Sequence, residues 1–498
     1  MLTIEPLHAL IHSLTKTEKR YFTLTAEMQK GQKEYLQLFK VLGSSKIFND
    51  SLVKLLKDKY PNSSIEPARK HLYSVIMKSL RHFENEKDIE IKLINLLQDA
   101  RLLHNKGLVE ASFELLQKAK EIAIEFEKFF HYLLAAKQEL DYLLRSQFVG
   151  VSENQLVEKQ EKFRELLELQ LGTAQHRMLY QILLLRYWKS GVVRNQKQIV
   201  SLNDLLLEEH QLLSGHRFKS FETQQLHLQF QSVYFFISGN PEGSLNVFRD
   251  LDTLFRSNYK LWQANPIYYI QLIDGILQDL RLIDRYEEMG YYYDRLRELT
   301  LPSENLQKTI EVMLLRHQLN SYSDQCKFKE GKDILLVTQK EIEKNLDHLP
   351  LQMQAETQLA IARVYFGNKE YSSVLKVVNN VLNQLSSYAS VTHSSFIVFH
   401  LLNIQVNIVL KNSDYLYYAI RSLERQLKNS RALYGVEELM LNIAKRWLSN
   451  KSISDVSDDL KRLEENPFEK YFIRTLFLDS WINTISTGKN KIKSGRMT

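Results

Sequence analysis

Histidine, aspartate and glutamate are the side chains from which catalytic or metal-binding chemistry is most often built, so their spacing is the first clue to function. The 14 histidines are scattered over 498 residues. Two of them, His393 and His400, are two helical turns apart, about 10 Å, which is too far for both to ligate one ion. The acidic residues lie in charged stretches, with no isolated pair in an apolar setting that would suit acid–base catalysis. Phosphate-binding glycine loops, HExxH and nucleophile-elbow motifs are absent from the sequence. We therefore expect no enzyme activity, no cofactor and no bound metal.

Cysteine usage and hydropathy indicate the compartment. Cys326 is the one cysteine, which excludes an intrachain disulfide and fits a reducing environment. The N-terminus carries Glu5 and no basic region, unlike a signal peptide. Residues 377–410 contain no Asp, Glu, Lys or Arg, but polar side chains and a serine-rich break interrupt them. This pattern favours a buried helix pair over a membrane span. We expect a cytoplasmic protein without membrane contact.

A basic helix near the N-terminus is the strongest candidate for binding a charged partner. Residues 69–83 place apolar side chains on one face and cations on the other, and no acidic residue occurs from 67 to 83. The helix follows a short helix and a tight turn, loosely like a helix-turn-helix unit, in which such cations would contact phosphates and bases. An ordinary amphipathic helix also shows its charges to water. The candidate nucleic-acid contacts are Arg69, Lys70, Lys78 and Arg81.

The elements that position these residues are predicted to be helices throughout. Glycine and proline are scarce, with 16 and 8 residues. Helical periodicity dominates, and several segments share one pattern: a helix, a short polar turn, and a second helix with small or apolar residues at fixed offsets. Residues 362–382 give the clearest copy. The candidate repeat-core residues are Ala111, Ser244, Phe248, Tyr286, Tyr293, Phe328, Gly331, Ala362, Tyr365, Tyr371 and Val374.

This pattern resembles the tetratricopeptide repeat, although valine replaces alanine at two positions of the clearest copy. The interval between turns is about 44 residues, longer than the usual 34, which helices of roughly 18 residues would explain. Two of the turns, near Ser152 and Lys197, are placed by this spacing alone. A HEAT-like array is the alternative. The resemblance implies an all-α, right-handed superhelical solenoid of about eight helix hairpins, whose concave surface binds a peptide or a partner helix along its first helices.

The two ends differ from the repeats. We expect residues 1–88 to form a small helical domain in which Thr15 and Glu18 make a capping box. Residues 89–450 form the repeat array, 451–485 a helical cap on its open end, and 486–498 a disordered basic tail. Residues 1–90 carry 15 Lys and Arg against 11 Asp and Glu, and the tail carries four cations and no acid. Only the two ends are therefore candidates for anionic partners.

The sequence favours a protein-binding scaffold of unknown partner. Tyrosine clusters such as Tyr415, Tyr417 and Tyr418, together with the adjacent Tyr187 and Trp188, are either groove-lining contacts or packing between long helices. The alternative function is a transcriptional or nucleic-acid-linked regulator, in which residues 1–88 bind DNA and the array senses a peptide or partner.

Overall fold

The computed structural model is all-α: its regular elements are helices, and no strand occurs in the part of the chain that it describes. None of the helices in these ranges has both the length and the apolar composition that crossing a bilayer requires. The structure describes residues 3–27, 34–45, 48–60, 65–84, 88–215, 220–301, 303–347, 349–385, 393–430, 434–451, 456–466 and 468–485. The predicted basic tail lies outside these residues.

The chain forms two compact units, residues 1–167 and 168–498. The division falls inside one long helix, α9 (Glu153–Ser190). The predicted domain boundary at residue 88 lies within the first unit, where Asp88 caps helix α6 (Ile89–Asn105) by accepting a hydrogen bond from the N–H of Glu90 at 2.7 Å.

The first unit begins with five helices. The last of them, α5, packs on α2 and α3, and its Leu72 and Ile76 are fully buried. The predicted capping box is confirmed: the Thr15 N–H donates to the Glu18 carboxylate at 2.6 Å, and the Glu18 N–H donates to the Thr15 hydroxyl at 3.2 Å. The predicted break at 61–64 lies outside the described residues. The five helices are α1 (Ile4–Ser13), α2 (Lys16–Glu27), α3 (Glu34–Ser44), α4 (Asp50–Lys59) and α5 (Ile65–Glu84).

Three further helices, α6, α7 (Val109–Glu125) and α8 (Phe129–Arg145), complete the first unit with the start of α9. Their contact depends on small residues, as expected, but in a shifted register. Ala111 is half-buried, whereas the next residue, Ser112, is fully buried and donates to the Ala100 carbonyl at 2.8 Å. The reason is local: α7 begins at Val109 after an exposed Leu108, so its buried face starts one residue later than the repeat pattern places it.

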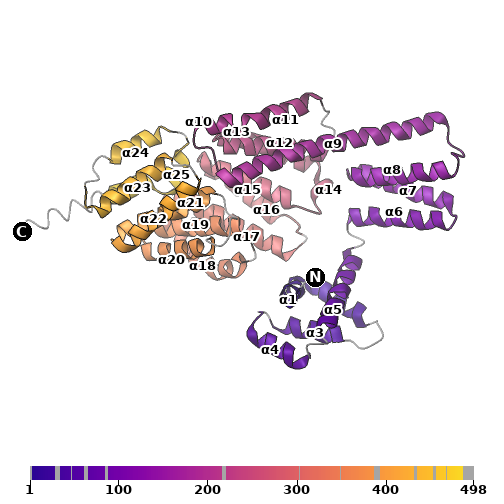
Figure 1. The fold of residues 1–498 in the computed structure, drawn as a ribbon, viewed down its shortest axis with the longest axis horizontal. Helices are drawn as coiled ribbons and strands as arrows, with labels where there is room; N and C mark the ends of the chain where they lie inside the picture. Colours follow the sequence, from indigo (N-terminus) through magenta and orange to yellow (C-terminus); the bar gives the residue numbers. More distant parts are fainter. Residues whose placement is uncertain are drawn as a thin grey trace, which may run out of the picture. The chain divides into compact units, whose positions relative to one another are not determined.

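The second unit is a succession of helix pairs in which consecutive helices pack against each other in chain order, as Figure 1 shows from magenta to yellow. The first helices of the pairs are α12 (Phe221–Ile237), α15 (Ile267–Leu282), α17 (Glu304–Asp324), α19 (Leu351–Gly367), α21 (His393–Val409) and α23 (Gly435–Leu448). The second helices are α13 (Pro241–Ser257), α16 (Met289–Arg297), α18 (Phe328–Leu346), α20 (Tyr371–Leu385), α22 (Ser413–Ser430) and α24 (Val456–Glu464). Shorter elements are α10 (Gln196–Val200), α11 (Asn203–Gly215), α14 (Tyr259–Trp262), the 3₁₀ turn η1 (Tyr286–Glu288) and α25 (Lys470–Thr475).

One backbone device ends many of the helices. A residue in the left-handed region ends the first helix of a pair at intervals of 39 to 48 residues, and at most of these turns the following N–H donates back into the helix, as from Glu370 to the Tyr365 carbonyl at 2.9 Å. This is the Schellman arrangement. Gln147 and Gly191 lie within a few residues of the two turns that spacing alone predicts. The residues at these intervals are Gly107, Gln147, Gly191, Gly239, Asp284, Cys326, Lys369, Lys411 and Asn450; Glu127, Phe148, Gly150 and Phe477 also have a positive φ and fall outside this spacing.

Helix pairs interlock through aromatic rings that lie on glycines. A Cβ atom on Gly275 of α15 would overlap the ring of Phe248 of α13, and one on Gly367 of α19 would overlap the ring of Phe328 of α18. Of the other predicted repeat-core residues, Ser244, Gly331, Ala362 and Val374 are buried. The larger ones are half-buried, namely Phe248, Tyr286, Tyr293, Phe328, Tyr365 and Tyr371.

The longest helix departs from the expected helix length. α9 has 38 residues where the repeat pattern expects helices of roughly 18. Gly172 alone interrupts its pattern, and one glycine costs a helix only about 1 kcal/mol. Packing offsets that cost, because Gly172 is buried. The next residue, Thr173, lies against α12, where its hydroxyl is 3.0 Å from the hydroxyl of Thr223.

Candidate interaction surfaces

The C-terminal segment, residues 468–485, lies against many earlier helices of the second unit. A cap is predicted at residues 451–485, at the end of the array; α24 does pack on α23, but the residues after it run back along the unit. Phe468 packs with α9 and α12, and Figure 1 shows α25 beside α21. The Glu469 carboxylate accepts hydrogen bonds from the Arg194 guanidinium at 2.5 and 3.1 Å.

Arg194 joins three parts of the chain that are distant in sequence. Its side chain is 4% exposed, and it donates two hydrogen bonds of 2.9 Å to Glu437 of α23 as well as those to Glu469. The guanidinium lies 3.8 Å from the ring centre of Phe472 of α25. Two carboxylates therefore pair with one buried guanidinium, and the bidentate geometry fixes the orientation of both carboxylates.

The C-terminal segment is bound through its main chain as well. The helix breaks after α25 at Phe477, whose φ is 50°, and residues 478–485 resume it. This break leaves carbonyl groups without helical donors. The Arg363 Nε of α19 donates to the Thr475 carbonyl at 3.1 Å, and the Gln405 amide of α21 donates to the Leu476 carbonyl at 2.9 Å. Side chains of two first helices thus cap α25.

Asp324 of α17 is the centre of the cation cluster beside this segment. Its side chain is fully buried and accepts hydrogen bonds from Arg281 of α15 and Arg363, each at 2.6 Å. Arg474 of α25 approaches the same carboxylate at 3.4 Å and also pairs with Asp284 at 2.7 Å. Burial opposes ionisation of Asp324, but the neighbouring guanidiniums, Arg363 first, hold the pKa of its carboxyl well below the usual range.

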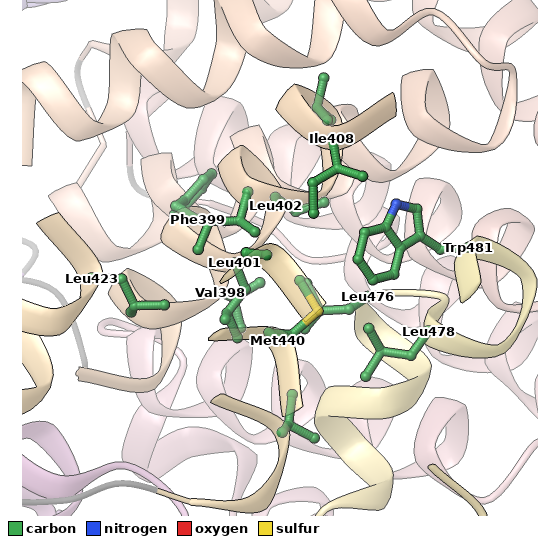
Figure 2. Close-up of a cluster of buried hydrophobic side chains, with 14 of the residues drawn as sticks. Val398, Phe399, Leu401, Leu402, Ile408, Leu423, Met440, Leu476, Leu478 and Trp481 are labelled. Carbon is green, nitrogen blue, oxygen red and sulfur yellow. The ribbon is translucent and has the colours of Figure 1, made fainter. Parts of the chain in front are cut away.

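Apolar side chains attach the rest of the segment. Figure 2 shows Leu476, Leu478 and Trp481 directed into the same cluster as Met440 and Ile408. All five are at most 2% exposed. The rings of Phe477 and Phe328 meet edge-on at 5.4 Å between centroids. The segment therefore belongs to the core of the second unit and is not a loosely held tail.

A second polar row crosses three consecutive first helices. Arg316 of α17 is 5% exposed and pairs with Asp274 of α15 and Glu356 of α19. His317 contacts the same Asp274 oxygen at 2.6 Å. Burial lowers the pKa of His317 to about 4 despite that carboxylate, so the imidazole is neutral at pH 7. Burial opposes ionisation of Asp274, but Arg316 and His317 hold its pKa far below the usual range.

Asp279 of α15 differs from these paired acids. It is fully buried, and no guanidinium or ammonium group is among the causes of its pKa shift. Burial raises the pKa of its carboxyl to about 8, against a smaller opposite effect of the Ser244 hydroxyl. The carboxyl is therefore mainly protonated at pH 7. A raised pKa alone does not make a catalytic group, and structural burial accounts for this one.

Among the described residues, no three His, Cys, Asp or Glu side chains are grouped so that they could hold a metal ion. Cys326 is exposed in the turn between α17 and α18, where its φ is 58°. Burial lowers the pKa of His400 to about 4.

The predicted nucleic-acid contacts all lie on α5, but they differ in availability. Arg69 is largely buried and pairs with Glu66 at 2.8 Å, and the same carboxylate lies 3.6 Å from Lys70. Glu66 stands one residue outside the acid-free stretch, so the sequence pattern missed it. Lys78 and Arg81 are exposed, and no carboxylate of the described residues is within ion-pair distance of either.

The tyrosine clusters separate into buried and exposed residues. Burial raises the pKa of Tyr187 far above its ordinary value, because the phenol lies inside the second unit near Glu356 and Tyr471. On α22, by contrast, Tyr415 and Tyr418 are 72% and 69% exposed. The exposed tyrosines Tyr415 and Tyr418 therefore lie on α22, which is the second helix of its pair.

The same helix carries a row of cations. Arg421, Arg425 and Lys428 follow Tyr418 on one side of α22, and they line a cavity of about 620 Å³ with Ser422 and Glu424. Glu424 pairs with Lys445 at 2.7 Å. Among the described residues, no carboxylate is in ion-pair distance of the three cations. We call Tyr415, Tyr418, Arg421, Arg425 and Lys428 the α22 face.

Comparison of the sequence with protein-family models and with curated proteins finds no match.

Proposed function

We propose that this protein is a non-enzymatic scaffold that binds an acidic segment of a partner protein. Its helix pairs form a right-handed superhelical array like that of tetratricopeptide proteins, in the cytoplasm. The proposal is supported by pairs that pack in chain order and by a left-handed turn residue every 39 to 48 residues. Each hairpin in such an array buries its apolar side only against its neighbours, which leaves long helical surfaces for partners.

The α22 face is the surface on which a partner binds. The first helices, which the sequence analysis favours for binding, already contact the chain's own C-terminal segment through Asp324, Arg363 and Gln405. The single observation that carries the proposal is the α22 face itself. Exposed tyrosines give large contact area at low entropy cost, and unpaired cations select carboxylates.

The test compares a charge reversal on the α22 face with an equal reversal elsewhere. Arg421→Glu with Arg425→Glu reverses two of the three cations of the row, and Lys118→Glu with Lys137→Glu changes two exposed lysines of α7 and α8. Both variants and the wild type are used to capture partners from the native host, with quantitative identification. We expect one or more partners to be lost with the α22 variant alone. Retention of every partner at wild-type level would disprove this binding surface.

A direct measurement uses a fluorescent glutamate-rich peptide as the probe. Its affinity for the full chain should fall as salt rises, because the attraction is between exposed charges. The α22 variant should lose that binding, and the α7–α8 variant should keep it. Equal binding by the two variants would show that the peptide responds only to net charge.

The second candidate is a nucleic-acid-linked regulator, and the exposure of Lys78 and Arg81 on α5 favours it. The full chain is titrated with duplex DNA at several salt concentrations. A steep linear dependence of log K on log salt, lost in Lys78→Glu with Arg81→Glu, supports this function. Absence of binding at low salt removes it.

A further inference from the structure

The C-terminal half of α9 is apolar on two opposite sides. One side is buried: Leu179 and Leu183 are at most 1% exposed and pack with α11 and α12. On the other side Leu171, Met178 and Leu185 are 60%, 49% and 52% exposed. Helices of soluble proteins normally present one apolar stripe, and a second one marks a contact that the single chain does not make.

The exposed side follows the spacing of a coiled-coil seam. Starting at Leu171, six exposed residues are separated by three and four residues in alternation, as the a and d positions of a heptad are; the exposed Arg177 lies beside this row. The stripe spans about 26 Å of helix at 1.5 Å per residue. It belongs entirely to the second unit. We call it the α9 seam: Leu171, Ala174, Met178, Gln181, Leu185 and Trp188, all exposed.

We propose that the α9 seam pairs with the same seam of a second copy of this chain, in antiparallel orientation. In this register the a positions of one helix face the d positions of the other. Leu171 then lies opposite the second copy's Trp188, and Ala174 opposite its Leu185. The two central layers pair Met178 with Gln181. Each layer matches its symmetry equivalent, as a two-fold interface requires.

Size and charge both fit this register. The small Ala174 faces the large Leu185, so facing side chains can interdigitate. The two ends of the seam are flanked by opposite charges: Glu168 precedes the seam and Lys189 follows it, and both are exposed. Antiparallel pairing brings each Glu168 near the Lys189 of the second copy, whereas parallel pairing brings like charges together. The helix is already folded, so pairing does not require the ordering of a new helix.

The test is the mass of the full chain in solution, measured by sedimentation equilibrium at micromolar to tens of micromolar concentration. We expect twice the chain mass. Met178→Glu with Leu185→Glu should weaken dimerisation at least about tenfold, because four charges enter the seam. Leu336→Glu is the matched control, since Leu336 of α18 is 65% exposed and away from the seam in sequence. Circular dichroism of each variant verifies that it is folded.

A charge exchange tests the orientation. Glu168→Lys and Lys189→Glu should each weaken the dimer, and the double variant should restore it, which parallel pairing does not predict. A monomer at every concentration would overturn the proposal and leave the seam to a different partner. Equal dimerisation of the wild type and the seam variant would overturn it as well.

Discussion

The buried carboxylate of Asp324 holds three guanidiniums together, so its removal is the most informative perturbation. Asp324→Asn keeps the size of the side chain and removes the charge. Arg281 and Arg363 then lose a charged acceptor at 2.6 Å, and both are themselves almost fully buried. Removing one partner of a buried ion pair costs about 3–5 kcal/mol, because the remaining charges stay buried without compensation.

Thermal unfolding of the full chain measures this cost. At about 2 °C per kcal/mol for a unit of this size, the melting temperature of the second unit should fall by roughly 6–10 °C. Asp294→Asn is the control, because Asp294 pairs with Arg297 while its side chain is 70% exposed. Exposed pairs contribute at most about 1 kcal/mol, so its melting temperature should barely change.

The same carboxylate predicts a pH dependence. Its folded pKa lies below the unfolded value of about 3.9. Its stabilisation is therefore fully present above that unfolded value and is lost as pH falls through the folded pKa. Asp324→Asn should flatten the acid limb of the stability curve. An Asp324→Asn protein that melts within a degree of wild type at pH 7, with an unchanged acid limb, would refute this account of the cluster.

Three further predictions follow from single residues. The pKa of Asp279 is raised to about 8, so the contribution of its carboxyl to the free energy of unfolding is complete below about pH 4 and is lost as pH rises to about 8. Asp279→Asn should therefore stabilise the protein at about pH 8 by a few kcal/mol. Its denaturant midpoint should also depend less on pH than that of the wild type. Gly275→Ala should cost about 1–3 kcal/mol in urea unfolding, because the new methyl overlaps the Phe248 ring, and Phe248→Leu in the same chain should recover part of it. Lys369→Gly should stabilise by up to about 1 kcal/mol, since φ is 62° there; a loss of stability would contradict the turn assignment.

Local patterns in the sequence predicted the helical content and several of the turns, but not the length of α9. The capping box at Thr15 and the small residues Ser244 and Ala362 depend on neighbours within one or two helices, and the structure has them where the pattern places them. Spacing placed two further turns within six residues of Gln147 and Gly191. The shift from Ala111 to Ser112 shows the limit, because one residue in the start of a helix changes which side chain is buried.

The contacts of the C-terminal segment could not be predicted in this way. Arg194 and Glu469 are 275 residues apart, and neither belongs to a motif. A charged residue in an otherwise apolar stretch, such as Arg363 within residues 359–366, gave the one available signal, since buried cations require partners. Nothing in one sequence says which distant carboxylate or carbonyl that partner is. The availability of Arg69 depended likewise on Glu66, one residue beyond the basic stretch.

The position of residues 468–485 along the first helices decides which surfaces remain for partners, and hydrogen–deuterium exchange of the full chain measures it most directly. The account predicts that amides of 470–485 are protected as strongly as those of α17 and α19, because Trp481 and Leu476 are at most 2% exposed within the same core. Exchange of this segment within seconds, with α17 and α19 protected, would contradict it and return the first helices to the candidates for partner binding.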